Sequence, residues 1–109
     1  MTLQAQKEIE KKLKKKIKVI DLRWLSDINL SNLLKAIGTC AKVLIVDECR
    51  KRGCHGEGLI ADIASVTNKR LTIKLHAAED SFIPLGEAAT VTLPSKQSII
   101  KHALELVNG

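Results

Sequence analysis

The chain has 109 residues, of which 45% are hydrophobic and 28% charged, a balance typical of a folded domain that excludes a disordered chain. At this length we expect a single domain, residues 1–109, with one core. No apolar run approaches the roughly 20 residues of a membrane span, and the N-terminus lacks the apolar segment of a signal peptide. We therefore expect no membrane partner, a cytoplasmic setting and three reduced cysteines.

The net charge of +6 is concentrated near the N-terminus, where residues 1–23 hold eight basic and three acidic groups. This pattern favours a solvated helix over a nucleic-acid interface, which usually spreads over several elements. The chain also has only one Trp and one Phe with which to stack bases. We predict no nucleic-acid partner, and a small basic nucleic-acid-binding or regulatory module is the alternative from another functional class.

The first half of the chain predicts a charged helix over residues 2–16, with apolar side chains every four residues. Residues 17–23 are rich in β-branched side chains and predict a strand. After a turn, Asn29 is placed to cap a helix that ends at Gly38. Residues 43–46 (VLIV) then predict a central parallel strand that is covered on both faces.

The second half continues with a helix over residues 59–66 and a strand over residues 71–76, where apolar and polar side chains alternate. A loop follows as far as residue 89, and residues 90–93 predict a short extended piece. Ser95 is placed to cap a last amphipathic helix.

This alternation of helices and strands predicts an α/β fold with three layers, α/β/α, around a mostly parallel sheet. The predicted order begins with a helix that no strand precedes, which is unusual for a fold of this kind. We therefore expect the sheet to lack its first strand.

The loop at residues 47–58 follows the predicted central strand, where open α/β sheets tend to bind ligands. The spacing of Gly53, Gly56 and Gly58 matches neither the dinucleotide fingerprint nor the P-loop. We interpret these glycines as residues that allow a helix to pack closely on a strand.

Metal and catalytic interpretations of the same loop are weak. Four residues separate Cys49 and Cys54, the long end of the usual zinc-ligand spacing, but a structural site needs four ligands and no second pair follows. His55 is adjacent to Cys54, but neighbouring loop residues seldom point at each other, and His76 and His102 stand alone on other predicted elements. We predict no metal site and no catalytic residue.

Four stretches, in order, resemble the C-terminal domain shared by transketolases and the decarboxylating component of 2-oxo acid dehydrogenases. They are residues 20–29 (IDLRWLSDIN), 43–48 (VLIVDE), 53–63 (GCHGEGLIADI), and 79–86 (EDSFIPLG) with 93–95 (LPS). The last of these stretches, residues 79–86 with 93–95, is most similar to the 2-oxo acid dehydrogenase branch. A transketolase, a deoxyxylulose phosphate synthase or an oxoacid–ferredoxin oxidoreductase is the alternative parent.

The sequence departs from the family pattern at Asp27, Asn29 and Cys54–His55. The family's domain also begins with a strand before its first helix. The resemblance therefore agrees with the missing strand expected from the order of elements.

The resemblance implies a role in subunit association. Thiamine diphosphate and magnesium lie between two other domains in this family, so no cofactor is expected in this chain. The implied partners are the remaining domains or subunits of the same enzyme, a homodimeric mate and, in some members, the small binding domain of the dihydrolipoyl acyltransferase. The candidate interface residues are Trp24, Asp47, Glu48, Arg50, Arg52, Gly53, His55, Gly56, Gly58, Phe82 and Pro84.

Overall fold

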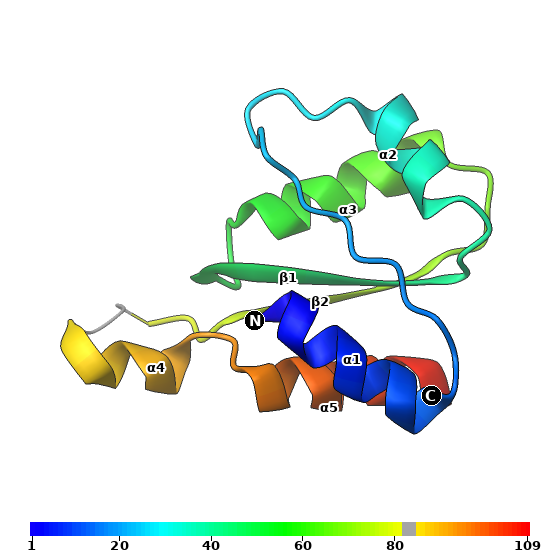
Figure 1. Cartoon of the computed structure of the whole chain (residues 1–109). Helices are drawn as coiled ribbons and strands as arrows, with labels where there is room; N and C mark the ends of the chain where they lie inside the picture. The colour runs from blue at the N-terminus through cyan, green and yellow to red at the C-terminus, as the bar shows by residue number, and fades with distance from the viewer. Residues whose placement is uncertain (82–84) are drawn as a thin grey trace.

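A computed structural model of the chain describes residues 1–81 and 85–109. The elements are α1 (Thr2–Leu13), α2 (Leu30–Ile37), β1 (Lys42–Arg50), α3 (His55–Val66), β2 (Thr72–Ala78), the 3₁₀ turn η1 (Gly86–Ala88), α4 (Ala89–Thr92) and α5 (Lys96–Asn108). β1 and β2 form a parallel sheet, with α2 and α3 over one face and α1 and α5 over the other (Figure 1). The predicted α/β class is confirmed, with a parallel sheet between two helical layers.

Local signals set the helix boundaries. The Asn29 side chain accepts a hydrogen bond from the backbone N–H of Asn32 at 3.0 Å, which caps α2 as predicted. Gly38 ends α2 with φ 61, a left-handed conformation that glycine adopts without strain. Ser95 begins α5 with a capping box, in which Ser95 and Ser98 bond each other's backbone N–H groups.

The predicted strand at residues 17–23 is wrong, because these residues pair with no strand among the residues that the structure describes. The segment is instead tied to α1 at its start. The Ile17 N–H donates to Glu10 Oε1, and the Ile17 carbonyl accepts from Gln6 Nε2, both at 2.8 Å. A β-branched composition makes a strand only where a neighbouring strand can pair with it.

The extended piece predicted at residues 90–93 is also wrong, since residues 89–92 form the short helix α4. The VLIV run lies in β1 as predicted, but β1 is longer, and it is paired along one edge only within the part of the chain that the structure describes. It is therefore not a central strand here, and its apolar side chains are half-buried.

Two hydrophobic clusters hold the layers together, one on each face of the sheet. The cluster between α1, α5 and β1 is built on Ala5, Ile9, Ile99 and Ile100, with Leu44 and Val46 packed against it. The cluster between α2, α3 and the two strands is built on Leu33, Ile37, Leu59 and Ile63, with Val43, Ile45 and Ile73 packed against it. The side chains of β1 alternate between the two clusters, as the period of a strand requires.

Candidate functional site

The predicted interface loop lies where β1 and β2 end, between β1 and α3. It is shorter than expected, because β1 extends through Arg50 and α3 begins at His55. Asp47, Glu48 and Arg50 are thus strand residues, whereas His55, Gly56 and Gly58 belong to the first turn of α3. We call residues 47–58 the carboxyl-edge loop.

Asp47 organises the carboxyl-edge loop. Its carboxylate accepts hydrogen bonds from the backbone N–H of Cys49 at 2.9 Å and of Gly56 at 3.1 Å. Partial burial of this carboxyl raises its pKa, but the two backbone donors outweigh burial and hold the pKa below its usual value. Asp47 therefore joins the end of β1 to the start of α3 as a carboxylate.

Asp47 also affects the cysteine beside it. The negative charge of Asp47, together with its hydrogen bond, raises the pKa of the Cys49 thiol. A thiol with a raised pKa is a poorer nucleophile and a poorer metal ligand. Cys54 is buried and donates to the Lys51 carbonyl at 3.4 Å, whereas its neighbour His55 is exposed, so the two do not act as a pair.

The three glycines of the carboxyl-edge loop have different structural roles. A Cβ on Gly56 would lie 2.5 Å from Leu75 Cδ1 and 3.3 Å from Ile45 Cγ2, so Gly56 allows α3 to approach the sheet. Gly53 adopts φ 74, and its N–H donates to Glu57 Oε2 at 2.7 Å. A Cβ on Gly58 would meet nothing within 4 Å. The packing interpretation is thus supported for Gly56, and the amides of Gly53 and Gly56 already bond carboxylates of the chain.

The tip of the loop is cationic and exposed at Arg50, Lys51 and Arg52. Asp80, just after β2, accepts from the Arg52 backbone N–H at 2.9 Å, and its Oδ2 lies 3.4 Å from Arg52 Nε. A hollow of about 390 Å³ is lined by Arg50, Arg52, Asp80 and Ser81. The tip therefore presents the exposed cations Arg50 and Lys51 to a partner, beside the acidic side chains of Glu48, Glu57 and Asp80.

The other predicted interface residues lie elsewhere. Trp24 is 76% exposed in the connection between α1 and α2, so it is not a core anchor. Phe82 and Pro84 lie outside the described residues. The structure thus gathers the candidates of the carboxyl-edge loop into one place and leaves Trp24 apart from them.

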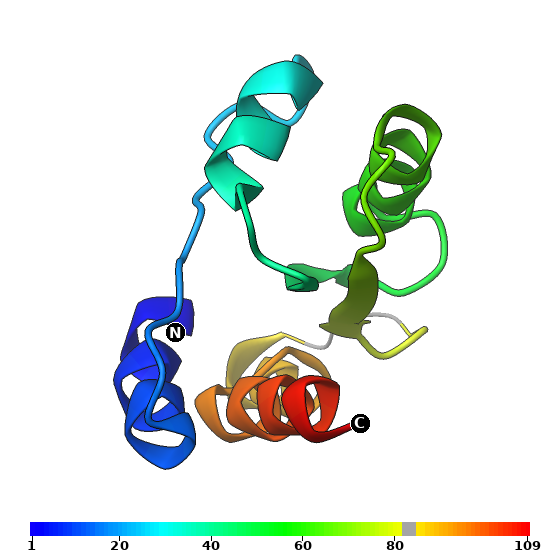
Figure 2. The ribbon, with the colours of Figure 1, turned by 90° about the vertical axis from the view of Figure 1, so that its right-hand side faces the viewer.

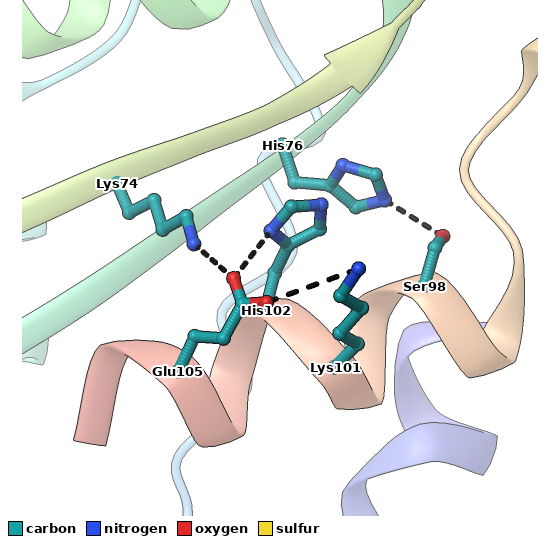
Figure 3. Close-up of polar contacts among 6 residues, drawn as sticks. All are labelled: Lys74, His76, Ser98, Lys101, His102 and Glu105. Atoms are coloured by element: carbon teal, nitrogen blue, oxygen red, sulfur yellow. Dashed lines mark hydrogen bonds and ion pairs between the residues drawn. The ribbon is translucent and has the colours of Figure 1, made fainter. Parts of the chain in front are cut away.

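A polar cluster between β2 and α5 was missed by the sequence interpretation, which placed His76 and His102 alone on separate elements. Their rings lie 4.2 Å apart between centroids, at an interplanar angle of 41° (Figure 3). Lys74 and His76 are two residues apart on β2 and share one face, and Ser98, His102 and Glu105 recur along one face of α5. The spacing of these residues on β2 and on α5 was the sequence signal that could have predicted the polar cluster.

One hydrogen bond in this cluster depends on the tautomer of His76. Its Nε2 lies 2.8 Å from Ser98 Oγ, and Ser98 Oγ also lies 2.9 Å from the Ser95 carbonyl. When the Ser98 hydroxyl donates to Ser95, it accepts from the His76 tautomer that is protonated on Nε2. Burial lowers the pKa of His76, and the positive charges of His102 and Lys74 lower it further.

Glu105 completes the cluster from the last turns of α5. Lys74 Nζ donates to Glu105 Oε2 at 2.7 Å, and this hydrogen bond holds the pKa of Glu105 below its usual value. His102 Nδ1 is buried and lies 3.4 Å from the same oxygen, without a hydrogen-bond partner among the described residues. The cluster joins α5 to β2 and brings no hydroxyl or thiol nucleophile to a histidine except the Ser98 hydroxyl, which is engaged in the helix cap.

The described residues include no group of three or more His, Cys, Asp or Glu side chains arranged to hold a metal ion. Within the same part of the chain, no helix has both the length and the apolar character to cross a membrane.

Comparison with known proteins gives distant matches to one kind of enzyme subunit. The chain is 29% identical over 104 residues to the pyruvate dehydrogenase E1 component subunit beta of Staphylococcus epidermidis, covering 94% of the chain and 32% of that relative. It is 26% identical over 106 residues to the same subunit of Staphylococcus aureus, covering 95% of the chain and 32% of the relative. No family model matches the chain. The chain spans about a third of the length of these curated relatives, and the matches support a distant relationship to 2-oxo acid dehydrogenase components.

Proposed function

We propose that the chain is the C-terminal, subunit-association domain of a thiamine diphosphate-dependent 2-oxo acid dehydrogenase. In this proposal the complete enzyme oxidatively decarboxylates a 2-oxo acid in the cytoplasm and transfers the acyl group to a lipoyl-bearing acyltransferase. The chain supplies no catalytic residue, and its partners are the remaining domains or subunits, a homodimeric mate and the acyltransferase binding domain.

The similarity to pyruvate dehydrogenase E1 beta subunits over 94% of the chain carries this proposal. The order of the four similar stretches supports it, as does the parallel α/β fold. Because the chain matches only 32% of each relative, the chemistry of the complete enzyme must depend on polypeptide that residues 1–109 do not include.

The chemistry of the carboxyl-edge loop supports assembly over catalysis. The amides of Gly53 and Gly56 are occupied by Glu57 and Asp47, and the pKa of Cys49 is raised. In this proposal, thiamine diphosphate and magnesium lie in the rest of the enzyme. What the loop presents to a partner is the cationic tip at Arg50, Lys51 and Arg52.

The test is reconstitution with the polypeptide from the same genome that carries the thiamine-binding part of the enzyme. We expect the two to co-elute in size-exclusion chromatography, and release of CO2 from a 2-oxo acid to require both. Arg50→Glu, at the cationic tip, should weaken the association. Lys12→Glu makes the same change of charge on the exposed surface of α1 and serves as the matched control.

A failure to co-elute at any protein concentration would contradict the proposed function. So would calorimetry that detects tight, magnesium-dependent binding of thiamine diphosphate to residues 1–109 alone. Equal effects of Arg50→Glu and Lys12→Glu would contradict the assignment of the carboxyl-edge loop to the interface, while the association itself would stand.

A further inference from the structure

The end of the molecule where both strands begin also collects the ends of three helices. Figure 1 shows α1, α2 and α5 ending on this side, and Figure 2 views the molecule from it. Basic residues from four separate segments lie here, and we call them the basic edge: Lys14, Lys15, Lys16 and Lys18 after α1, Lys35 in the last turn of α2, Lys42 at the start of β1, and Lys69 and Arg70 before β2. The positive charge that the sequence concentrates in residues 1–23 thus continues into a surface built from several elements.

Three lysines of the basic edge are committed to the fold. Lys18 Nζ donates to the Ala36 carbonyl in the last turn of α2, at 2.6 Å. Lys69 Nζ donates to the Gly38 carbonyl, just after the same helix, at 2.7 Å. Lys42 Nζ donates to two carbonyls in the last turn of α5, at 2.7 and 2.8 Å. A cation that bonds the free carbonyls at a helix C-terminus is satisfied there, so these three lysines need no partner outside the chain.

The other cations of the basic edge have no such use. Four exposed ones form no ion pair with a carboxylate among the described residues: Lys14, Lys15, Lys35 and Arg70. Glu10, which lies 3.9 Å from Lys16 Nζ, also accepts from the Ile17 N–H at 2.8 Å. The dipole at the end of α1 supplies only about half a negative charge. These cations therefore repel one another in the free chain, and an anionic partner would remove that repulsion.

The turn that carries residues 14–16 has a fixed conformation. Lys14 ends α1 with φ 53, in the left-handed region. The next turn of backbone is tied back to α1, because the Ile17 N–H donates to Glu10 and its carbonyl accepts from Gln6, both at 2.8 Å. The three lysines are thus presented on an ordered turn, so a partner that binds them has little backbone entropy to remove.

We propose that the basic edge binds an acidic segment of another polypeptide. The proposal goes beyond the proposed function, which assigns assembly to the carboxyl-edge loop at the other end of the strands. Charge complementarity carries it, since five cations that are not bonded to helix carbonyls come together from three segments: Lys14, Lys15, Lys16, Lys35 and Arg70. Aspartate or glutamate side chains of an extended segment can pair with such cations while the backbone of the segment stays in solvent.

Two other anionic partners fit this surface less well. None of the residues of the basic edge is aromatic, so bases have nothing to stack on, and only Arg70 offers a guanidinium fork for a phosphate. Five cations also fall short of the about 6–10 phosphate contacts that make DNA binding strongly dependent on salt. A bilayer is disfavoured because α1 buries its apolar residues Ala5 and Ile9 against α5 and has no apolar face to insert.

The test is fluorescence anisotropy of the complete chain with two labelled peptides, one of alternating glutamate and serine and one with glutamine in place of glutamate. We expect the glutamate peptide to bind at about 50 mM salt and to bind more weakly at about 200 mM, and the glutamine peptide not to bind. The double variant Lys15→Glu/Lys35→Glu should raise the Kd of the glutamate peptide by about tenfold or more, because two attractions become repulsions. The matched control is Arg50→Glu/Lys51→Glu, which makes the same change of net charge at the other end of the strands and should change the Kd far less.

Amide NMR shifts of the unsubstituted chain give a second measurement that does not depend on a variant. The glutamate peptide should move the signals of residues 14–18, 35–42 and 69–70 and leave those of residues 47–58 in place. Absence of binding, equal binding of the two peptides, equal effects of the two double variants, or shifts centred on residues 47–58 would each overturn the proposal. A short duplex DNA that binds more tightly than the glutamate peptide at the same salt would also overturn it, because the basic edge would then be a nucleic-acid surface.

Discussion

The two faces of the sheet are held by different chemistry. Toward α3, both strands contribute apolar side chains, and Gly56 lets the helix approach to van der Waals contact with Leu75 and Ile45. Toward α5, β1 contributes Leu44 and Val46, but β2 contributes polar groups. The polar cluster there consists of Lys74, His76, Ser98, His102 and Glu105.

This difference predicts which kind of change should destabilise each face of the sheet. Apolar contact is sensitive to volume, because close-packed interiors tolerate neither cavities nor added atoms. Hydrogen bonds and ion pairs among half-buried groups are instead sensitive to protonation and to salt. The α3 face should therefore respond to added methyl groups, and the α5 face to loss of hydrogen bonds and to acid.

The largest effect is expected at Gly56 on the α3 face. Gly56→Ala places a Cβ 2.5 Å from Leu75 Cδ1, so the free energy of unfolding should fall by about 1–3 kcal/mol, as in other overpacked sites. Gly58→Ala, two residues along α3, is the control, because its Cβ meets nothing within 4 Å. Urea unfolding of both variants makes the comparison. Equal stability of the two would show that Leu75 moves aside without cost.

A smaller loss is expected at Ser98 on the α5 face. Ser98→Ala removes the acceptor of the Ser95 N–H at 2.8 Å and the partner of His76 Nε2 at 2.8 Å. Loss of these contacts should lower the free energy of unfolding by about 1–2 kcal/mol. Ser65→Ala on α3 is the control, since Ser65 is exposed and its hydroxyl donates to the Asp62 carbonyl of its own helix. Equal losses of unfolding free energy in Ser98→Ala and Ser65→Ala would mean that the contacts of Ser98 in the polar cluster add no stability of their own.

The sequence predicted the elements whose signals are local. Asn29, Gly38 and Ser95 fix helix ends through hydrogen bonds and backbone conformations that involve near neighbours. Residues 17–23 have a strand-like composition, but strand formation depends on a partner that local signals do not report. The same reasoning explains β1, whose apolar run predicted a central strand although the described part of the chain pairs with it along one edge only.

The candidate site was predictable only in part. Strand ends meet at one edge of a parallel sheet, so the carboxyl-edge loop followed from the order of elements. The His76–His102 contact joins residues from different elements, and it depends on α5 packing over β2. Sequence spacing places each histidine on a face of its own element, but it does not say which faces meet.

Acid should weaken the α5 face through His76. The pKa of His76 in the fold is lowered from 6.5, so the unfolded chain binds more protons and stability falls as the pH drops below about 6.5. Imidazole NMR signals should give a midpoint below that of a free histidine peptide. His76→Gln, which keeps a donor for Ser98, should lose less stability than the unsubstituted chain between about pH 7.5 and about pH 5.5. Equal losses of stability in the variant and in the unsubstituted chain would contradict the proposal that His76 makes the fold sensitive to acid.

The smallest effect is expected at Glu105, whose ion pair with Lys74 is half-exposed to solvent and therefore partly screened. Glu105→Gln should lower stability less than Ser98→Ala does. Because the pKa of Glu105 is lowered from 4.5 in the fold, its contribution is present above about pH 4.5 and is lost as the pH falls through the folded value. The difference between the variant and the unsubstituted chain should therefore shrink in acid.

Salt gives an independent measurement of the same contribution. At about 1 M salt the screening length is about 3 Å, so the Coulomb part of the Lys74–Glu105 pair should largely disappear. Glu8→Gln is the control, because Glu8 pairs with Lys96 and so joins α1 to α5, not α5 to the sheet. Urea unfolding of both variants at low and high salt measures how much each ion pair contributes to stability and how strongly salt reduces that contribution. A loss at Glu105 that is unchanged by salt and by acid would mean that Glu105 acts through packing, and the α5 face would then resemble the α3 face.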